Sequence, residues 1–535
     1  MRARIRDLGS VGVNYDVPRH DLPPNALTDL QNVSLRDRAI RKSQGWSEAF
    51  SATGRPVTFD GWFDGQNGYA LVVVEAAGEA KVYELSGGSL VDISTATGFG
   101  TGLGWDTCVS GLTGVLTNES TVPYSRTPGD VGDIAPMPNW PGTWRAPIIR
   151  PYRNFLVALK VQKGGVNNGT RVQWSNASDL NTVPPDWDEL DPASLAGGFT
   201  LAGDGGPIVD GLELGQSFMI YTKTKAYSMT LTGGQYVMNV RPAFQRGLLA
   251  KNCVVAFDAG HFCVGNGVIY VTNGTSVTYM AEDKVQTRFF NELADVTNVH
   301  VAHDPKRRVI EIHYKDFRAA ADGDPNTVLR WDYSDDTWSF DDLHPVGVVR
   351  AKTFPTSQRV TTWASVDTDF NKVDVAWSDI EILWKDVDIT SGEPFYHMLV
   401  GDALQAATTS YIMRREDITL RDGTEYTTLI RREHIDFDQL LPQNPLATQS
   451  IKHVKRILPQ ITGSGKVWFR FGTANSANDN TTWSAYIEYD LDSDYKVDFR
   501  ESGRYFAWEM TTRVTDPTTF RLSGFDIDVE LAGER

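Results

Sequence analysis

The chain has 535 residues, with 51 lysines and arginines against 68 aspartates and glutamates, which gives a formal net charge of −17. Its 47 glycines and 25 prolines are an ordinary share, which excludes a collagen-like or low-complexity chain. With 41% hydrophobic residues and 15 tryptophans, the sequence predicts a folded, soluble protein with a sizeable core. The acidic balance disfavours a protein that grips nucleic acid through a basic surface.

The cysteines and the apolar runs indicate which further classes of protein are disfavoured. Cys108, Cys253 and Cys263 show no C-x-x-C spacing, so we expect reduced structural thiols, neither a disulfide framework nor a zinc ribbon. The opening MRARIRDLGSVGVNYD has no apolar segment after its basic residues, which argues against a secretory signal. No apolar run approaches the roughly 20 residues of a membrane-spanning helix, so we expect no membrane insertion.

Residues 1–50 are turn-rich and basic, and they predict an extended N-terminal arm with the first strands. Only the segment NALTDLQNV indicates a short helix. The basic residues of this arm are Arg2, Arg4, Arg6, Arg36, Arg38, Arg41 and Lys42. Two alternatives are open for them, an acidic neighbouring subunit as their target or a solvated basic tail.

Residues 51–440 are predicted to form a β-propeller-like body with loop insertions. Short segments rich in β-branched and aromatic residues alternate with Gly, Asn or Asp turns, which is typical of hairpins. These pairs are 69–75 with 80–85, 217–223 with 226–233, and 261–266 with 267–274. The clearest unit is Val309 to Tyr314 followed by 327–340, where Trp331 and Trp338 flank an acidic turn. The recurrence fits blades of about 40 to 50 residues, although stacked sandwiches would give the same local signals and the blade number is open.

Two long surface loops are predicted within this body, at Pro123–Pro151 and at 183–192. Both are candidates for subunit contacts, because long loops on a β scaffold commonly carry them. Residues 441–535 alternate polar and apolar residues in strand-like runs and predict a C-terminal β-rich platform, an antiparallel β-sandwich-like region. The predicted fold class is therefore all-β.

Two clusters contain residue types that bind metals but lack the spacing that a metal site requires. His300 and His303 lie near His313, but in a strand the first two face opposite sides, so a shared ion is disfavoured. Asp490, Asp492 and Asp494 imitate a calcium loop, yet Tyr495 stands where the sharp turn needs glycine. The alternation of the aspartates favours solvent-facing positions of a strand.

No catalytic constellation stands out from the sequence. The segment GFGTGLG at 98–104 fits neither a dinucleotide-binding nor a P-loop pattern and predicts a flexible turn. There is no G-x-S-x-G, and 68 acidic residues make any pair of carboxylates uninformative. We therefore predict that the protein is not an enzyme, with no catalytic, cofactor-binding or metal-ligating residues and no cofactor.

The segment SANDNTTWS at 476–484 resembles the Asp-box pattern Ser-x-Asp-x-Gly-x-Thr-Trp of sialidase-type propellers, with Asn478 and Asn480 in the Asp and Gly positions. Such a box marks a hairpin turn and not a catalytic site. Together with the tryptophans it supports an alternative, a glycan-binding or sialidase-like β-propeller. A sialidase should gather several arginines, a tyrosine and a carboxylate in one central pocket.

Both ends of the chain resemble a known family. Residues 12–46 contain a Pro-Pro-x-Ala-Leu segment, an Asn-Val strand, an Arg-bearing turn and Gly-Trp. With SGRYFAWEMTT at 502–512 and FRLSGFDIDVELAGER at 520–535, this stretch resembles the tail nozzle or tail hub proteins, also called tubular protein B, of short-tailed bacteriophages. The quoted stretches cover 62 of the 535 residues.

The resemblance implies a structural virion protein built around a β-propeller. Such a protein forms a homohexameric ring below the head-to-tail adaptor, lets genomic DNA pass without specific binding, and docks tail fibres, spikes or a needle. Its location would be the virion tail, assembled in the cytoplasm of the bacterial host. The net charge of −17 is consistent with a conduit wall that repels phosphates. The resemblance leaves open which fibre binds.

Overall fold

In the computed structural model, almost all of the regular secondary structure is β-strand. The structure describes residues 1–64, 67–86, 89–95, 98–179, 181–233, 237–321, 323–355, 394–402, 409–415, 418–441 and 450–532. Within these ranges there is one α-helix, α1 (Gln286–Glu292), and one 3₁₀ turn (Gly203–Gly205). Neither is long and apolar enough to cross a membrane.

Seven antiparallel sheets follow one another along the chain, and we number them as blades. Blade 1 contains β6 (Arg55–Phe63), β7 (Gly68–Ala76), β8 (Glu79–Ser86), β9 (Ser89–Asp92) and β10 (Phe99–Gly100). Blade 2 contains β11 (Asp106–Ser110), β12 (Thr113–Thr117), β13 (Tyr124–Arg126) and β14 (Ala135–Pro136). Blade 3 contains β16 (Ile148–Tyr152), β17 (Phe155–Leu159), β19 (Arg171–Trp174) and β20 (Gly197–Thr200), with the small ribbon β15 (Trp144–Arg145) and β18 (Gln162–Lys163) beside it in the chain.

The remaining blades repeat this arrangement. Blade 4 contains β21 (Ile208–Leu214), β22 (Ser217–Thr222), β23 (Ala226–Leu231) and β24 (Met238–Phe244). Blade 5 contains β25 (Val254–Phe257), β26 (Gly260–Val264), β27 (Ile269–Thr272) and β28 (Val277–Tyr279). Blade 6 contains β29 (Val299–Asp304), β30 (Val309–Tyr314), β31 (Thr327–Asp332) and β32 (Thr337–Asp342). Blade 7 contains β33 (Val346–Phe354), β34 (Phe395–Asp402), β35 (Thr409–Arg415) and β5 (Trp46–Thr53).

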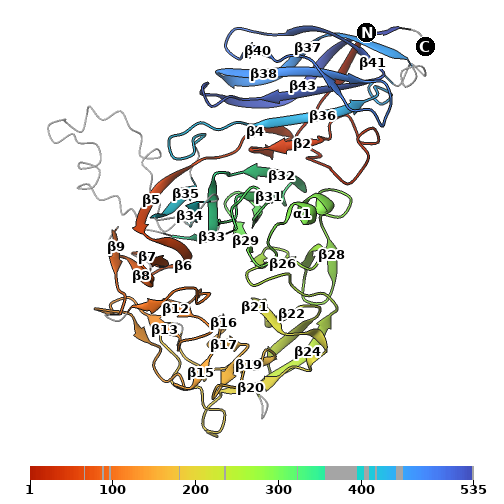
Figure 1. Cartoon of the computed structure of the whole chain (residues 1–535). Helices are drawn as coiled ribbons and strands as arrows, with labels where there is room; N and C mark the ends of the chain where they lie inside the picture. The colour runs from red at the N-terminus through yellow and green to blue at the C-terminus, as the bar shows by residue number, and fades with distance from the viewer. Residues whose placement is uncertain are drawn as a thin grey trace, which may run out of the picture.

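The blades close into a ring, so the body is a seven-bladed β-propeller. The first strand of each blade contacts the first strands of both neighbours, in the order β6, β11, β16, β21, β25, β29, β33 and back to β6. The closure also uses the beginning of the chain, because β5 pairs with β35 as the outer strand of blade 7. Figure 1 shows the chain passing from blade to blade around the ring. The all-β propeller prediction is confirmed.

The predicted hairpins are present in the blades. They correspond to β7–β8, β22–β23, β26–β27 and β31–β32. In the last of these Trp331 lies opposite Trp338, and the two rings stack with their centroids 5.9 Å apart. The acidic turn between them closes through Asp336, which has a φ of 52° and accepts a hydrogen bond from the Trp331 indole at 3.0 Å.

A second body, which we call the platform, is a sandwich of two sheets. Its first sheet contains β3 (Val33–Arg36), β4 (Ala39–Lys42), β43 (Thr519–Ala532), β37 (Ile451–Ser464), β41 (Val497–Gly503) and β1 (Arg2–Ile5). Its second contains β2 (Asp29–Gln31), β36 (Leu429–Ile435), β42 (Tyr505–Thr511), β38 (Lys466–Ala474), β39 (Thr482–Trp483) and β40 (Ile487–Asp490). Aromatic rings fill the space between the sheets, with the Trp508 and Phe525 centroids 4.6 Å apart.

One strand joins the two bodies. β2 pairs in parallel with β32 of blade 6, Gln31 opposite Phe340, and antiparallel with β36 of the platform. Asn32 reinforces the joint, because its backbone N–H donates to the Phe340 carbonyl and its Oδ1 accepts from the Asp342 N–H, both at 2.8 Å. Blade 6 and the second platform sheet are therefore one continuous sheet, with the platform lying beyond blade 6 (Figure 1).

The predicted boundaries at residues 50 and 440 differ from the structure. Residues 1–50 supply strands, but they do not project as an arm: β1 and β4 pair with β43, and β5 belongs to blade 7. β36, placed with the body by the sequence, belongs to the platform. The expected short helix at NALTDLQNV is wrong, since its second half forms β2. These pairings join distant segments, and local periodicity carries no sign of them.

The two predicted loops are only partly loops. The stretch from Pro123 to Pro151 contains β13 to β16, and its Trp140 is buried. Residues 183–192 have no regular structure, as expected, but their Trp187 is buried against Trp140 at 4.6 Å between ring centroids. Both segments therefore contribute to the core between blades 2 and 3.

Candidate functional site

Buried ion pairs join the inner strands of the propeller. Arg150 on the inner strand of blade 3 lies between Asp106 of blade 2 and Asp210 of blade 4, at N–O distances of 2.7 and 3.0 Å. Arg350 of blade 7 contacts the other oxygen of Asp106 at 3.1 Å. Asn252 completes the arrangement from blade 5, because its Oδ1 accepts from Arg150 at 3.2 Å. Four inner strands are thus tied together by buried charges.

Arg150, Arg350, Asp106, Asp210 and Asn252, which we call the axial group, are charged or polar residues that stabilise one another. Asp106 is fully buried, and although burial opposes ionisation, Arg150 and the neighbouring cations hold its pKa well below its usual range. The same carboxylates raise the pKa of Arg150 despite its burial. Each carboxylate is committed to a guanidinium, so the group offers no poised acid, base or nucleophile.

Two cavities flank this axial group. One, with a volume of about 450 Å³, is lined mainly by the inner strands of blades 5, 6 and 7, including His303, Arg350 and Lys352. The other, about 490 Å³, lies where the inner strands begin. Both volumes fall in the range of ligand-binding cavities, roughly 300–1,000 Å³.

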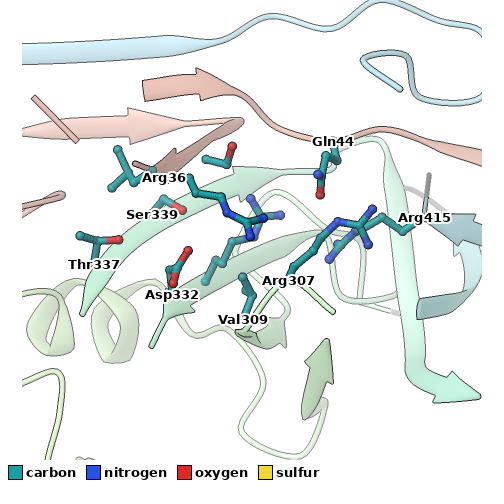
Figure 2. A pocket seen from close by; sticks show the side chains of 11 residues that line it. Arg36, Gln44, Arg307, Val309, Asp332, Thr337, Ser339 and Arg415 are labelled. Atoms are coloured by element: carbon teal, nitrogen blue, oxygen red, sulfur yellow. The ribbon is translucent and has the colours of Figure 1, made fainter. Parts of the chain in front are cut away.

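A third, smaller pocket lies at the junction between blade 6 and the platform (Figure 2). Its volume is about 40 Å³, room for little more than water. Four arginines line it, namely Arg36, Arg307, Arg330 and Arg415. In Figure 2 the side chains of Arg307 and Arg415 lie next to each other on one side of the pocket, and Arg36 reaches over it from the platform.

Buried carboxylates balance these arginines. Glu311 accepts hydrogen bonds from Arg330 and Arg415, both at 2.9 Å, and from the Tyr396 hydroxyl at 2.7 Å. Burial opposes its ionisation, but Arg415 and Arg330 hold the pKa of Glu311 well below its usual range. Arg330 also pairs with Asp341. The junction pocket is therefore an ionic joint between blades 6 and 7 and the segment that enters the platform.

Arginines, a glutamate and aromatic residues meet on the outer face of the second platform sheet. Glu509 is fully buried beneath Arg431 and Arg470, with N–O distances of 2.5 and 2.7 Å, and accepts a hydrogen bond from Tyr486. Arg470 lies over the Trp483 ring at 4.7 Å. This group has the arginines, tyrosine and carboxylate expected of a sialidase site. It lies on the platform, however, and not in the central pocket that such an enzyme requires.

The histidines singled out in the sequence do not form a metal site. The rings of His300 and His313 stack with their centroids 4.6 Å apart, whereas His303 forms a hydrogen bond with the Tyr333 hydroxyl at 3.0 Å. His300 and His303 therefore face opposite sides of their strand, as the strand geometry predicts. Within the described ranges no group of three or more His, Cys, Asp or Glu residues is arranged to hold a metal ion. The three cysteines are buried and unpaired.

Two local predictions in the C-terminal region need correction. Asp490 is the last residue of β40, as a strand position would require, but Asp492 and Asp494 lie in the turn that follows it. The Asp494 N–H donates to the Asp490 carbonyl at 2.9 Å, and the Asp494 Oδ2 accepts from the Asp490 N–H. The Asp-box-like segment 476–484 does join two strands, β38 and β39, but these belong to the platform and not to a propeller blade. A short motif of this kind predicts the local turn but not the sheet to which the two strands belong.

The basic residues near the beginning of the chain find partners within the same chain. Arg2 pairs with Asp528 at 3.3 Å, and Arg6 pairs with Asp526 at 2.5 Å. The other internal pairs of this group are Arg4 with Asp526, Arg38 with Asp7, Arg41 with Asp37 and Lys42 with Glu425. Within these pairs the side chains of Arg4 and Arg38 remain 66% and 73% exposed, so a neighbouring subunit and a solvated position both stay predictions for them.

The buried charges of the axis and junction were not recognised in the sequence, although they leave a trace there. Arg150 lies in IIRPY and Glu311 in VIEIHY, each a charge inside an otherwise apolar strand. A charge that is carried into a core requires a partner, so such a position predicts a buried ion pair. The sequence does not reveal which residue the partner is.

Comparison with known proteins adds little to this description. No family model and no curated protein matches the chain in sequence. Among solved structures, the WD40 β-propeller domain of Doa1 aligns over 70% of this chain and 98% of its own, with 9% identity and a TM-score of 0.36. BBS1N, solved in complex with ARL6DN, aligns over 70% and 99%, with 10% identity and the same TM-score.

Proposed function

We propose that the protein is a structural component of a bacteriophage tail, a nozzle or hub that forms a hexameric ring below the head-to-tail adaptor. The observation that carries the proposal is the meeting of the two sequence stretches that resemble this family. β2 to β4 of residues 12–46 and β42 and β43 of residues 502–535 belong to one body, the platform. A likeness that covers one coherent body is stronger support than two scattered matches.

The propeller axis bears on the route of DNA in this proposal. Arg150 and Arg350 tie inner strands of blades 2, 3, 4 and 7 together through buried ion pairs, which a polymer widening a path through one propeller would have to break. In the proposed assembly the conduit therefore runs between copies of the chain. Cyclic rings use two different complementary patches on each subunit, and the platform and the propeller offer distinct surfaces for them.

The test is mass photometry of the purified protein, alone and with a candidate head-to-tail adaptor ring. A ring-sized mass, about six times 59.4 kDa alone or more with the adaptor, supports the proposal. A persistent monomer in both samples contradicts it and favours the alternative, a glycan-binding or sialidase-like propeller. That alternative is then tested on a glycan array and with a sialidase substrate, using Arg470→Ala as the variant that should abolish any activity of the platform group.

A further inference from the structure

We propose that the cavity at the start of the inner strands, which we call the axial mouth, binds an acidic, partly apolar peptide segment of a partner protein. The mouth has a volume of about 490 Å³ and is built by the connections that lead into five successive blades. Its lining residues near the axis are Leu103, Pro147, Ile148, Pro207, Ile208, Val209, Leu249 and Ala250. An extended peptide that alternates apolar and polar residues presents the side chains that such a floor accepts.

Lysines surround this apolar floor. Lys160, Lys223 and Lys251 line the mouth together with a single acidic residue, Glu119. Lys160 lies 3.8 Å from Glu119, which leaves the mouth with an excess of positive charge. In a chain with a net charge of −17, a concave surface with this sign is unusual.

Two of these lysines are not neutralised by the protein. Among the described residues, Lys223 and Lys251 form no ion pair, and the hydrogen bond of Lys251 goes to the Gly104 carbonyl at 3.3 Å. Asp106 and Asp210 of the axial group attract Lys251, whose pKa burial lowers, but these two carboxylates are already paired with Arg150 and Arg350. Carboxylates of a bound peptide would supply the missing negative charge in a partly enclosed site, where ion pairs are stronger than on an open surface.

The axial mouth would be the surface on which the proposed tail protein docks a partner. Only the identity of that partner, a tail component, rests on the proposed function. The probe is a fluorescein-labelled decapeptide of alternating aspartate and leucine, with an asparagine–leucine peptide as its uncharged counterpart. Fluorescence anisotropy on the full chain should show binding of the acidic peptide that weakens as sodium chloride rises from 0.05 to about 0.5 M. The uncharged peptide should bind at least about tenfold more weakly.

Charge-reversal variants locate the site. Lys223 is exposed, so Lys223→Glu should fold normally and weaken binding about tenfold or more. The matched control is Lys455→Glu, which makes the same change of charge on the platform and should alter binding less than about twofold. Circular dichroism on each variant verifies that the fold is unchanged.

Four outcomes overturn the inference: no binding, equal binding of both peptides, equal loss in the two variants, or displacement of the peptide by a short deoxythymidine oligonucleotide, which indicates a phosphate site. Mass photometry of the same samples separates this test from that of the proposed function. A ring without peptide binding contradicts only the axial mouth, and peptide binding without a ring contradicts only the assembly.

Discussion

The propeller and the platform are built from the same kind of strand but by different rules of pairing. In the propeller, the strands of each blade come from one stretch of the chain, and among the described strands only β5 joins its blade from far away in the sequence. In the platform, β1 pairs with β43, placing Ile5 opposite Phe525. The difference teaches that turn chemistry alone can specify a blade, whereas the platform exists only when distant segments meet. Four predictions test this contrast, in order of decreasing effect.

The largest effect is expected from the axis of the propeller. Arg150→Met should lower the free energy of unfolding by about 3–5 kcal/mol, because it leaves Asp106 and Asp210 buried with too little positive charge nearby. Urea denaturation followed by tryptophan fluorescence measures the change. The control is Arg153→Met, three positions on and exposed, which should shift the midpoint little. Comparable losses in the two variants would show that the axis does not hold the blades together.

A smaller effect is expected where the chain ends meet. Ile5 is 1% exposed on β1, and Ile5→Ala should cost roughly 2–4 kcal/mol through lost burial and the cavity left behind. Hydrogen exchange should then rise along β43 and leave the blades protected. Arg4→Ala, on the exposed side of the same strand, should leave β43 protected. Uniform loss of protection across both bodies would show that propeller and platform open together.

Acid should affect the propeller before the platform. Burial lowers the pKa of His397 to about 3 and of His261 to about 4. Such histidines take up a proton on unfolding, so the free energy of unfolding should fall as the pH drops from about 6.5, by about 1.4 kcal/mol per pH unit for each.

The variant His397→Phe tests this pH dependence. It keeps the stack on Phe354, whose centroid is 4.3 Å away, and removes the proton-binding group. Thermal melting between pH 7 and pH 4 should therefore show a shallower loss of stability than in the native chain. An unchanged slope would assign the acid sensitivity to other groups.

The smallest effect is expected on the outer platform face. Trp483→Ala removes the ring beneath Arg470 and should cost about 0.5–1 kcal/mol. Trp508→Ala, in the core of the same body, is the contrasting variant and should cost about 3–5 kcal/mol. Equal losses, measured by urea denaturation, would mean that the outer face is packed like the core.

The sequence predicts the parts of this fold that depend on neighbouring residues. The hairpin with Trp331 and Trp338 could be read directly, because alternating apolar residues and an acidic turn specify it locally. The number of blades could not, since the contact between β6 and β33 that closes the ring leaves no local pattern.

The candidate sites were harder to predict than the hairpins. Arg150 and Glu311 are recognisable as charges in apolar strands, but the sequence does not show their partners. Those of Arg150 come from other blades, and Glu311 pairs with Arg330 of its own blade and with Arg415 of blade 7. The axial mouth is assembled from connections between five blades, each with at most one or two lysines, so no segment contains its pattern. Such a surface becomes visible only when the ring is closed.

The pairing of β1 and β4 with β43 joins segments that are synthesised far apart in time. Translation at about 5–20 residues per second separates the synthesis of β4 from that of β43 by roughly 25–100 s. Throughout that interval Ala3 and Ile5 lack their β43 partners, Ile527 and Phe525. β5 likewise waits for β35 before the ring can close. The nascent chain thus has two unpaired strand edges for most of its synthesis. The translation rate determines how long these edges can pair with another chain.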